Sequence, residues 1–132
     1  MKKMIAVIFC ATMLLGAAQV LAAGADVRIC ALTKAFSCLS DEGCKEVSLA
    51  EMDIPRFVKI DLGSKVIASL DKQVSRPDTT FSAIERLEGM IVLHGADARG
   101  WSMAIAEDSG GLTVTASGED EGFVVFGNCI TP

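Results

Sequence analysis

Residues 57–70 read FVKIDLGSKVIASL and carry the clearest structural pattern in the chain. Within residues 57–62, apolar and charged side chains alternate, which is the period of a β-strand with one buried face. Gly63-Ser64 then supplies a two-residue turn of the kind that joins hairpin strands. Residues 65–70 repeat the alternation. The stretch therefore predicts a β-hairpin.

The same rhythm continues to the end of the chain. Short β-compatible segments recur, and turns rich in Gly or in polar residues separate them. These segments are residues 79–87, 90–94, 101–106, 112–116 and 123–126. Together with the first hairpin they predict an antiparallel meander of seven strands.

Residues 27–38 fit two interpretations. They can be drawn as a helix, or as an eighth strand that pairs with residues 123–126. We favour the strand, because closing the sheet removes exposed edges. The predicted fold is mainly β, a small antiparallel up-and-down barrel or clamshell of seven or eight strands, and it occupies a single domain over residues 23–132.

The first 22 residues have the layout of a secretory signal peptide. Met1-Lys2-Lys3 is positively charged, residues 4–15 are almost entirely apolar, and Val20-Leu21-Ala22 precedes the expected cleavage point. The alternative is an uncleaved membrane anchor. We expect cleavage, no stable membrane insertion afterwards, and a periplasmic or secreted location in a bacterium.

Cysteine usage predicts disulfides. Cys10 leaves with the leader, and an even set remains, namely Cys30, Cys38, Cys44 and Cys129. Three pairings are possible. We favour Cys38–Cys44 with Cys30–Cys129, because a polar turn containing Gly lies between the first two. The spacing is not a zinc pattern and the chain has one histidine, so we expect no metal.

Three further segments carry a family resemblance, namely Pro55–Leu62, Gly100–Met103 and Gly122–Cys129, the last reading GFVVFGNC. With the two early cysteines, they resemble a group of small exported bacterial proteins. The resemblance implies export and a small β-fold. It transfers no catalytic residue.

Residues that could support catalysis are few. His94 ends a predicted strand, Ser109 lies in a Gly-rich turn, and no nucleophile elbow occurs. Carboxylates gather at Glu107-Asp108 and in residues 119–121, without the spacing of a calcium loop. We therefore expect neither catalytic residues nor a cofactor, and no enzymatic activity.

The aromatic residues divide between the two faces of the sheet. Trp101 begins an alternating apolar face and is expected to anchor the core. Phe123 and Phe126 are three positions apart, so they face opposite sides. One of them, or Phe57, should lie outside, where the segment 45–55 covers it or where it marks a contact patch.

Charge and fold together define the expected function. The chain has a net charge of −5, and loss of Lys2 and Lys3 lowers this to −7, which disfavours nucleic acid. We expect a non-catalytic exported binding protein that uses surface loops to act on another macromolecule of the cell envelope, such as a hydrolase that it inhibits. The alternative is a carrier of a small apolar ligand inside the barrel, which a cavity of several hundred Å³ would favour.

Overall fold

The computed structural model describes residues 26–74 and 76–132, and these form a single antiparallel sheet of ten strands. The predicted signal peptide lies outside the described residues. None of the described residues belongs to a helix that could span a membrane. The strands are β1 (Val27–Leu39), β2 (Gly43–Val47), β3 (Phe57–Asp61), β4 (Val66–Ser69), β5 (Thr79–Thr80), β6 (Ala83–Leu87), β7 (Met90–Ala96), β8 (Gly100–Ala106), β9 (Gly111–Ser117) and β10 (Glu121–Ile130).

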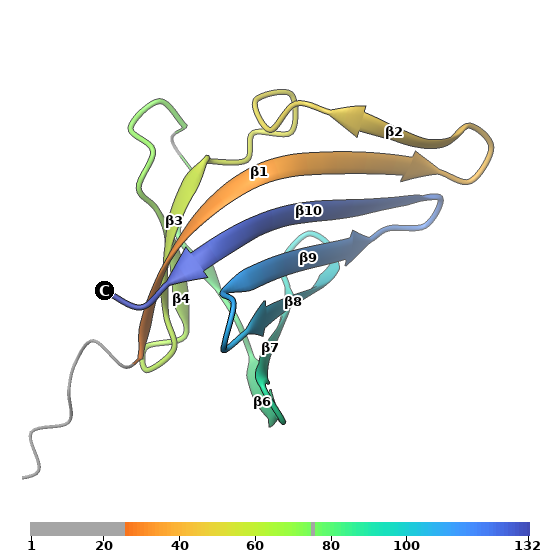
Figure 1. Ribbon diagram of the computed structural model, residues 1–132. Coiled ribbons are helices and arrows are strands. Elements are labelled where there is room, and N and C mark those ends of the chain that lie inside the picture. Colours follow the sequence, from red (N-terminus) through yellow and green to blue (C-terminus); the bar gives the residue numbers. More distant parts are fainter. Residues whose placement is uncertain (1–25, 75) are drawn as a thin grey trace, which may run out of the picture.

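The strand order is β5-β4-β3-β1-β10-β9-β8-β7-β6, and β2 also pairs with β1. The sheet curls into a half-barrel (Figure 1). The predicted class, a mainly β antiparallel clamshell with disulfides, is confirmed. Two details go beyond the prediction. A further strand, β2, follows Cys38, and the segment 79–87 is divided into β5 and β6.

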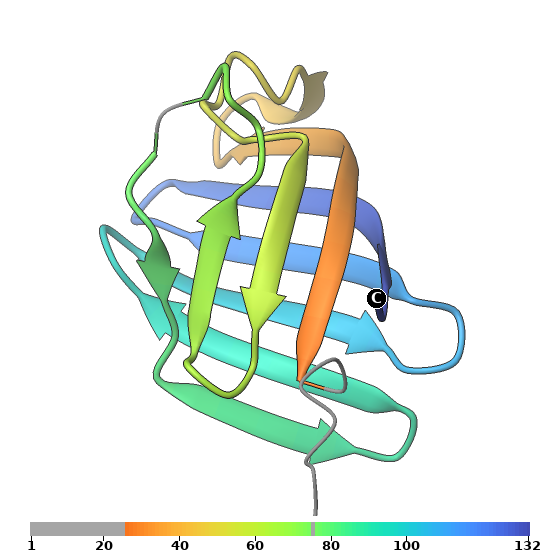
Figure 2. The ribbon, with the colours of Figure 1, turned by 90° about the vertical axis from the view of Figure 1, so that its left-hand side faces the viewer.

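The long strand β1 holds the two halves of the sheet together. Residues 27–31 pair with β3, whereas residues 35–39 pair with β2. An irregularity between Leu32 and Lys34 separates these parts, and such a bulge bends a strand. Figure 2 shows β3, β4 and the first part of β1 in front of β7–β10, with the strands running across them. The bend therefore sets the curl of the sheet.

The predicted pairing of the first and last strands is present, and β1 is a strand over its whole length. Within this pairing, Phe126 lies opposite Lys34 and Phe123 lies opposite Ser37. Both strands are longer than the sequence indicated, since β1 continues to Leu39 and β10 runs from Glu121 to Ile130.

Both disulfides join residues that lie directly opposite each other on neighbouring strands. Cys30 bonds to Cys129 across β1 and β10, and Cys38 bonds to Cys44 across β1 and β2. This is the pairing that the sequence favoured. The first pair is buried within the core, whereas Cys44 is exposed at the hairpin. Disulfides of this kind persist in oxidising surroundings, as found outside the cytosol.

The segment between β5 and β6 connects the two sides of the half-barrel. The backbone N–H of Phe81 donates to the carbonyl of Lys65 at 3.1 Å, beside β4. The next N–H, from Ser82, donates to the carbonyl of His94 in β7 at 2.8 Å. The chain therefore crosses here from the β4 side to the β7 side, which is why the expected single strand appears as two.

The apolar core lies between the two sides of the half-barrel. Cys30, Ile60, Ile91, Leu93 and Ile105 are each less than 2 % exposed. They come from β1, β3, β7 and β8, whose inward faces meet there. Further along the sheet, inward side chains of β1, β8, β9 and β10 face those of β3 and β4 across an open groove.

Candidate ligand-binding groove

The concave face of the sheet contains an open groove of about 520 Å³. Its floor is formed by alternate residues of the curled strands, so the period of two that builds the core also builds the groove. The main apolar side chains on this floor are Leu32, Val58, Trp101, Val114, Phe123 and Val125. Most of its exposed lining is apolar, and this suits the binding of apolar molecules.

One wall of the groove comes from the segment between β2 and β3. Met52 and Ile54 line the groove and pack against the core. Ser48 and Glu51 shape the turn before them. The Ser48 hydroxyl and backbone N–H both donate to Glu51, at 2.7 and 2.9 Å, and Glu51 N–H donates back to the hydroxyl. These bonds hold the pKa of Glu51 below its ordinary value.

Two arginines from different loops also line the groove. Arg76, between β4 and β5, donates to the carbonyl of Asp53 at 3.3 Å and so links two rim segments. Arg99, in the turn between β7 and β8, pairs with Glu121. Its guanidinium lies 4.8 Å from the centre of the Phe123 ring, within the range of a cation–π contact. The rim is thus polar above an apolar floor.

Trp101 is half-buried, and it forms part of the groove floor instead of being fully enclosed in the core. It lies opposite Gly95 on β7. A Cβ added at Gly95 would lie 2.2 Å from the Trp101 ring, so the indole occupies the space that any other residue at 95 would fill. The absence of a side chain at Gly95 sets the position of Trp101.

We expect Gly95→Ala to displace the indole of Trp101. Because Trp101 is the single tryptophan of the chain, its emission reports this change directly. The emission maximum should move to longer wavelength as the ring becomes more exposed. In the control Gly100→Ala nothing lies within 4 Å of the added Cβ, and the emission should not change. An unchanged spectrum for Gly95→Ala would contradict this account of the Trp101 position.

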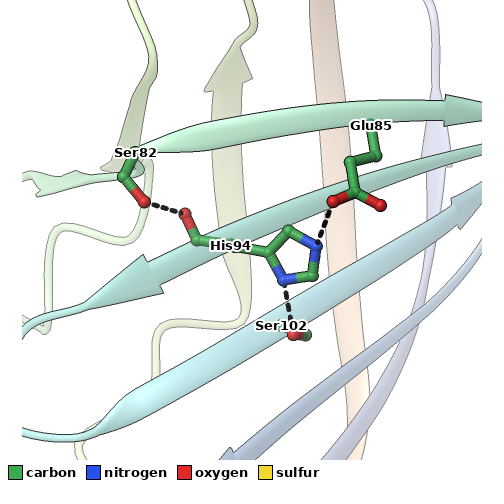
Figure 3. A network of polar contacts seen from close by, with 4 residues as sticks. All are labelled: Ser82, Glu85, His94 and Ser102. Carbon is green, nitrogen blue, oxygen red and sulfur yellow. Dashed lines mark hydrogen bonds and ion pairs between the residues drawn. The ribbon is translucent and has the colours of Figure 1, made fainter.

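His94, the sequence candidate for acid–base chemistry, belongs to a polar cluster on the convex face (Figure 3). Its Nδ1 lies 2.8 Å from the Ser102 hydroxyl, and its Nε2 lies 3.7 Å from a Glu85 oxygen. Its carbonyl accepts hydrogen bonds from Ser82, as drawn in the figure.

The order Ser102, His94, Glu85 is that of a nucleophile, a base and an acid. However, the residues stand on three regular strands, and Ser102 lies within a ladder that pairs with β7 on one side and β9 on the other. Its neighbours therefore offer no convergent N–H donors for an oxyanion. The cluster is best described as cross-strand polar contacts.

The other sequence candidates are spread over separate turns. Ser109 lies between β8 and β9, and its hydroxyl accepts from the N–H of Gly111 at 3.2 Å. Glu107-Asp108 shares that turn, whereas residues 119–120 lie between β9 and β10. Within residues 26–74 and 76–132 no three His, Cys, Asp or Glu side chains come together as a metal site would require.

Sequence reasoning missed the groove because its rim comes from three loops that are far apart in the chain. Two signals were visible. The spacing of Ser48 and Glu51, typical of a capping box, indicated an ordered turn. The alternation of residues 101–105 placed the Trp101 side chain on the inward face of its strand. Neither shows that the inward faces of β8–β10 border an open groove.

Comparisons with family models, with curated proteins and with solved structures find no match for this chain.

Proposed function

We propose that this protein is a non-catalytic exported binding protein that holds a small apolar ligand in the groove. The observation that carries the proposal is the 520 Å³ hollow with an apolar floor, which falls in the usual size range of small-molecule sites. A closed barrel of short strands would be filled by its own side chains. The half-barrel instead leaves an open groove.

Two features of the groove favour the binding of a small apolar ligand. A ligand that enters it removes apolar surface of Trp101, Phe123 and Met52 from water, and burial of such surface favours binding. The strands that form the floor are held by ladders and by the buried Cys30–Cys129 bond. A floor of this kind needs little ordering on binding, which lowers its entropic cost.

A protein partner is the second candidate. The groove opens to solvent beneath loops, so an apolar side chain of another envelope protein could insert between them. This arrangement is compatible with the predicted inhibitor of a hydrolase. It predicts binding of a folded protein and no binding of small apolar molecules.

The proposal is tested with N-phenyl-1-naphthylamine, an apolar dye that brightens when it leaves water. We expect saturable binding, displacement by decanol, and energy transfer from Trp101 on the groove floor. Ala116, on β9 opposite Trp101, lines the groove, so Ala116→Phe fills it. This variant should weaken dye binding about tenfold or more, a change of roughly 1.4 kcal/mol.

The matched control is Thr115→Phe, which adds the same ring one residue earlier, on the exposed side of β9. It should bind the dye as the parent protein does. Equal loss in both variants, or absence of saturable binding in the parent protein, would overturn the groove as the site.

A further inference from the structure

We propose that the convex face around Phe57 and Phe126 is a docking surface for an anionic lipid bilayer. The surface is made by β1, β3 and β10, on the side of the sheet opposite the groove. It concerns a different face from the ligand site, so it stands or falls independently of the function proposed above.

Four apolar side chains form this surface, called here the phenylalanine patch: Phe36, Phe57, Leu70 and Phe126. Phe126 faces outward because its neighbour Val125 lines the groove, and it remains 40 % exposed. The Phe36 ring meets it edge-on, with the ring centres 6.1 Å apart.

Phe57 extends the patch across β1. Its neighbour Val58 is buried in the core, so Phe57 points outward, and it is 51 % exposed. It lies opposite Ala31 on β1, and Ala31 in turn pairs with Asn128 of β10, two residues from Phe126. The segment 45–55 does not cover Phe57, contrary to one of the two sequence expectations, because that segment packs its apolar residues against the core instead.

Leu70 completes the patch beside Phe57. Its backbone N–H donates to the Phe57 carbonyl at 2.9 Å, and its side chain is 47 % exposed. Exposed apolar residues are common singly, but neighbouring ones on one sheet face mark an interaction surface.

Positive charge surrounds the patch. Lys34 lies opposite Phe126, and Lys59 shares the outward phase of Phe57. Arg56 and Lys72 are exposed and lie one and two residues from Phe57 and Leu70. None of the four cations belongs to the ion pairs of the described residues.

The acidic groups near the patch are fewer, and two of them are already hydrogen-bonded. Asp71 accepts from the N–H groups of Arg56 and Gln73. Asp61 accepts from that of Ser64 and is also attracted to Lys59, which forms no ion pair with it. Glu46, opposite Phe36, is the third. The protein as a whole has a net charge of −5. A group of cations without ion pairs around an apolar patch is therefore a local excess of positive charge on an acidic protein.

This chemistry fits an anionic lipid surface. Aromatic side chains enter the boundary between headgroups and acyl chains, and Lys and Arg nearby are attracted to anionic headgroups. A second copy fits less well. Two convex faces touch over little area, and both would present the same unpaired cations.

The test measures sedimentation of the exported protein with vesicles of phosphatidylcholine, or of phosphatidylcholine and phosphatidylglycerol in equal parts. We expect binding to the anionic vesicles, weaker binding to the neutral ones, and loss of the difference at high salt. Phe57→Ser with Phe126→Ser should lower the partition coefficient about tenfold or more.

The control is Leu87→Ser, because Leu87 is 54 % exposed on β6, at the far edge of the sheet. It should bind vesicles as the parent does. Lys34→Gln with Lys59→Gln should weaken binding to anionic vesicles only. Near-ultraviolet circular dichroism of each variant shows whether the fold is retained.

Three results would overturn the proposal. These are equal binding to both vesicle types, equal loss in the Leu87→Ser control, and absence of binding. Dimerisation without lipid that the double phenylalanine variant abolishes would assign the patch to a second copy instead.

Discussion

Replacing Cys30 and Cys129 together by Ala should lower the free energy of unfolding by about 4–5 kcal/mol. The bond closes a loop with a sequence separation of 99, which spans almost the whole domain. In the chain-entropy model, opening such a loop releases more unfolded-state freedom than opening a short one. Both residues are also buried, so the variant loses core packing as well. Urea unfolding followed by circular dichroism measures the change.

The matched control is the double variant Cys38→Ala and Cys44→Ala. This pair has a sequence separation of 6 and lies at an exposed hairpin, so its loss should cost only about 2 kcal/mol. If the two double variants lose equal stability, loop length does not determine the stability that the Cys30–Cys129 disulfide provides.

Gly110→Ala should be the most damaging single substitution of a turn residue, with a loss of roughly 3 kcal/mol or more. Gly110 has a φ of +72°, where an L side chain is strained. Its backbone carbonyl also accepts from Cys129 N–H at 2.8 Å. An added Cβ would lie 2.0 Å from the Cys129 carbonyl oxygen. The strand β10 would therefore have to move at the point next to the Cys30–Cys129 disulfide.

Gly89→Ala separates the two causes. Gly89 has nearly the same φ, +73°, but nothing lies within 4 Å of an added Cβ. This variant should lose only the backbone term, about 1–2 kcal/mol. The difference between the two variants in thermal or urea unfolding measures the steric contact alone. Equal losses of stability would mean that the turn next to β10 accommodates the added Cβ of Gly110→Ala without a further loss of free energy.

Local sequence was sufficient for the strands of the meander. Alternation over residues 57–62 and 101–106 follows from the period of two, and turn residues separate these segments whatever lies around them. The same local logic favoured the pairing of Cys38 with Cys44, since five residues with a Gly lie between them.

Non-local pairing explains where the sequence argument was incomplete. Residues 43–47 alternate weakly and form a strand only because the second half of β1 has a free edge beside it. The segment 79–87 has the composition of one strand, but Phe81 and Ser82 bond to opposite sides of the half-barrel. No window of a few residues contains that information.

The sequence by itself determined the fold class and the set of cysteines available for disulfides, because these depend on side-chain period and on residue type. The inward phase of residues 65–70 was not determined, since the structure turns Ile67 inward and leaves Leu70 exposed on the convex face. The tertiary structure decided the groove and the phenylalanine patch. Both depend on the bend of β1 at Leu32 and Lys34, which leaves an open groove on the concave face and brings Phe57 and Phe126 to one convex surface. Curvature of a sheet is the sum of pairings between distant strands, so it appears only when the strands are assembled.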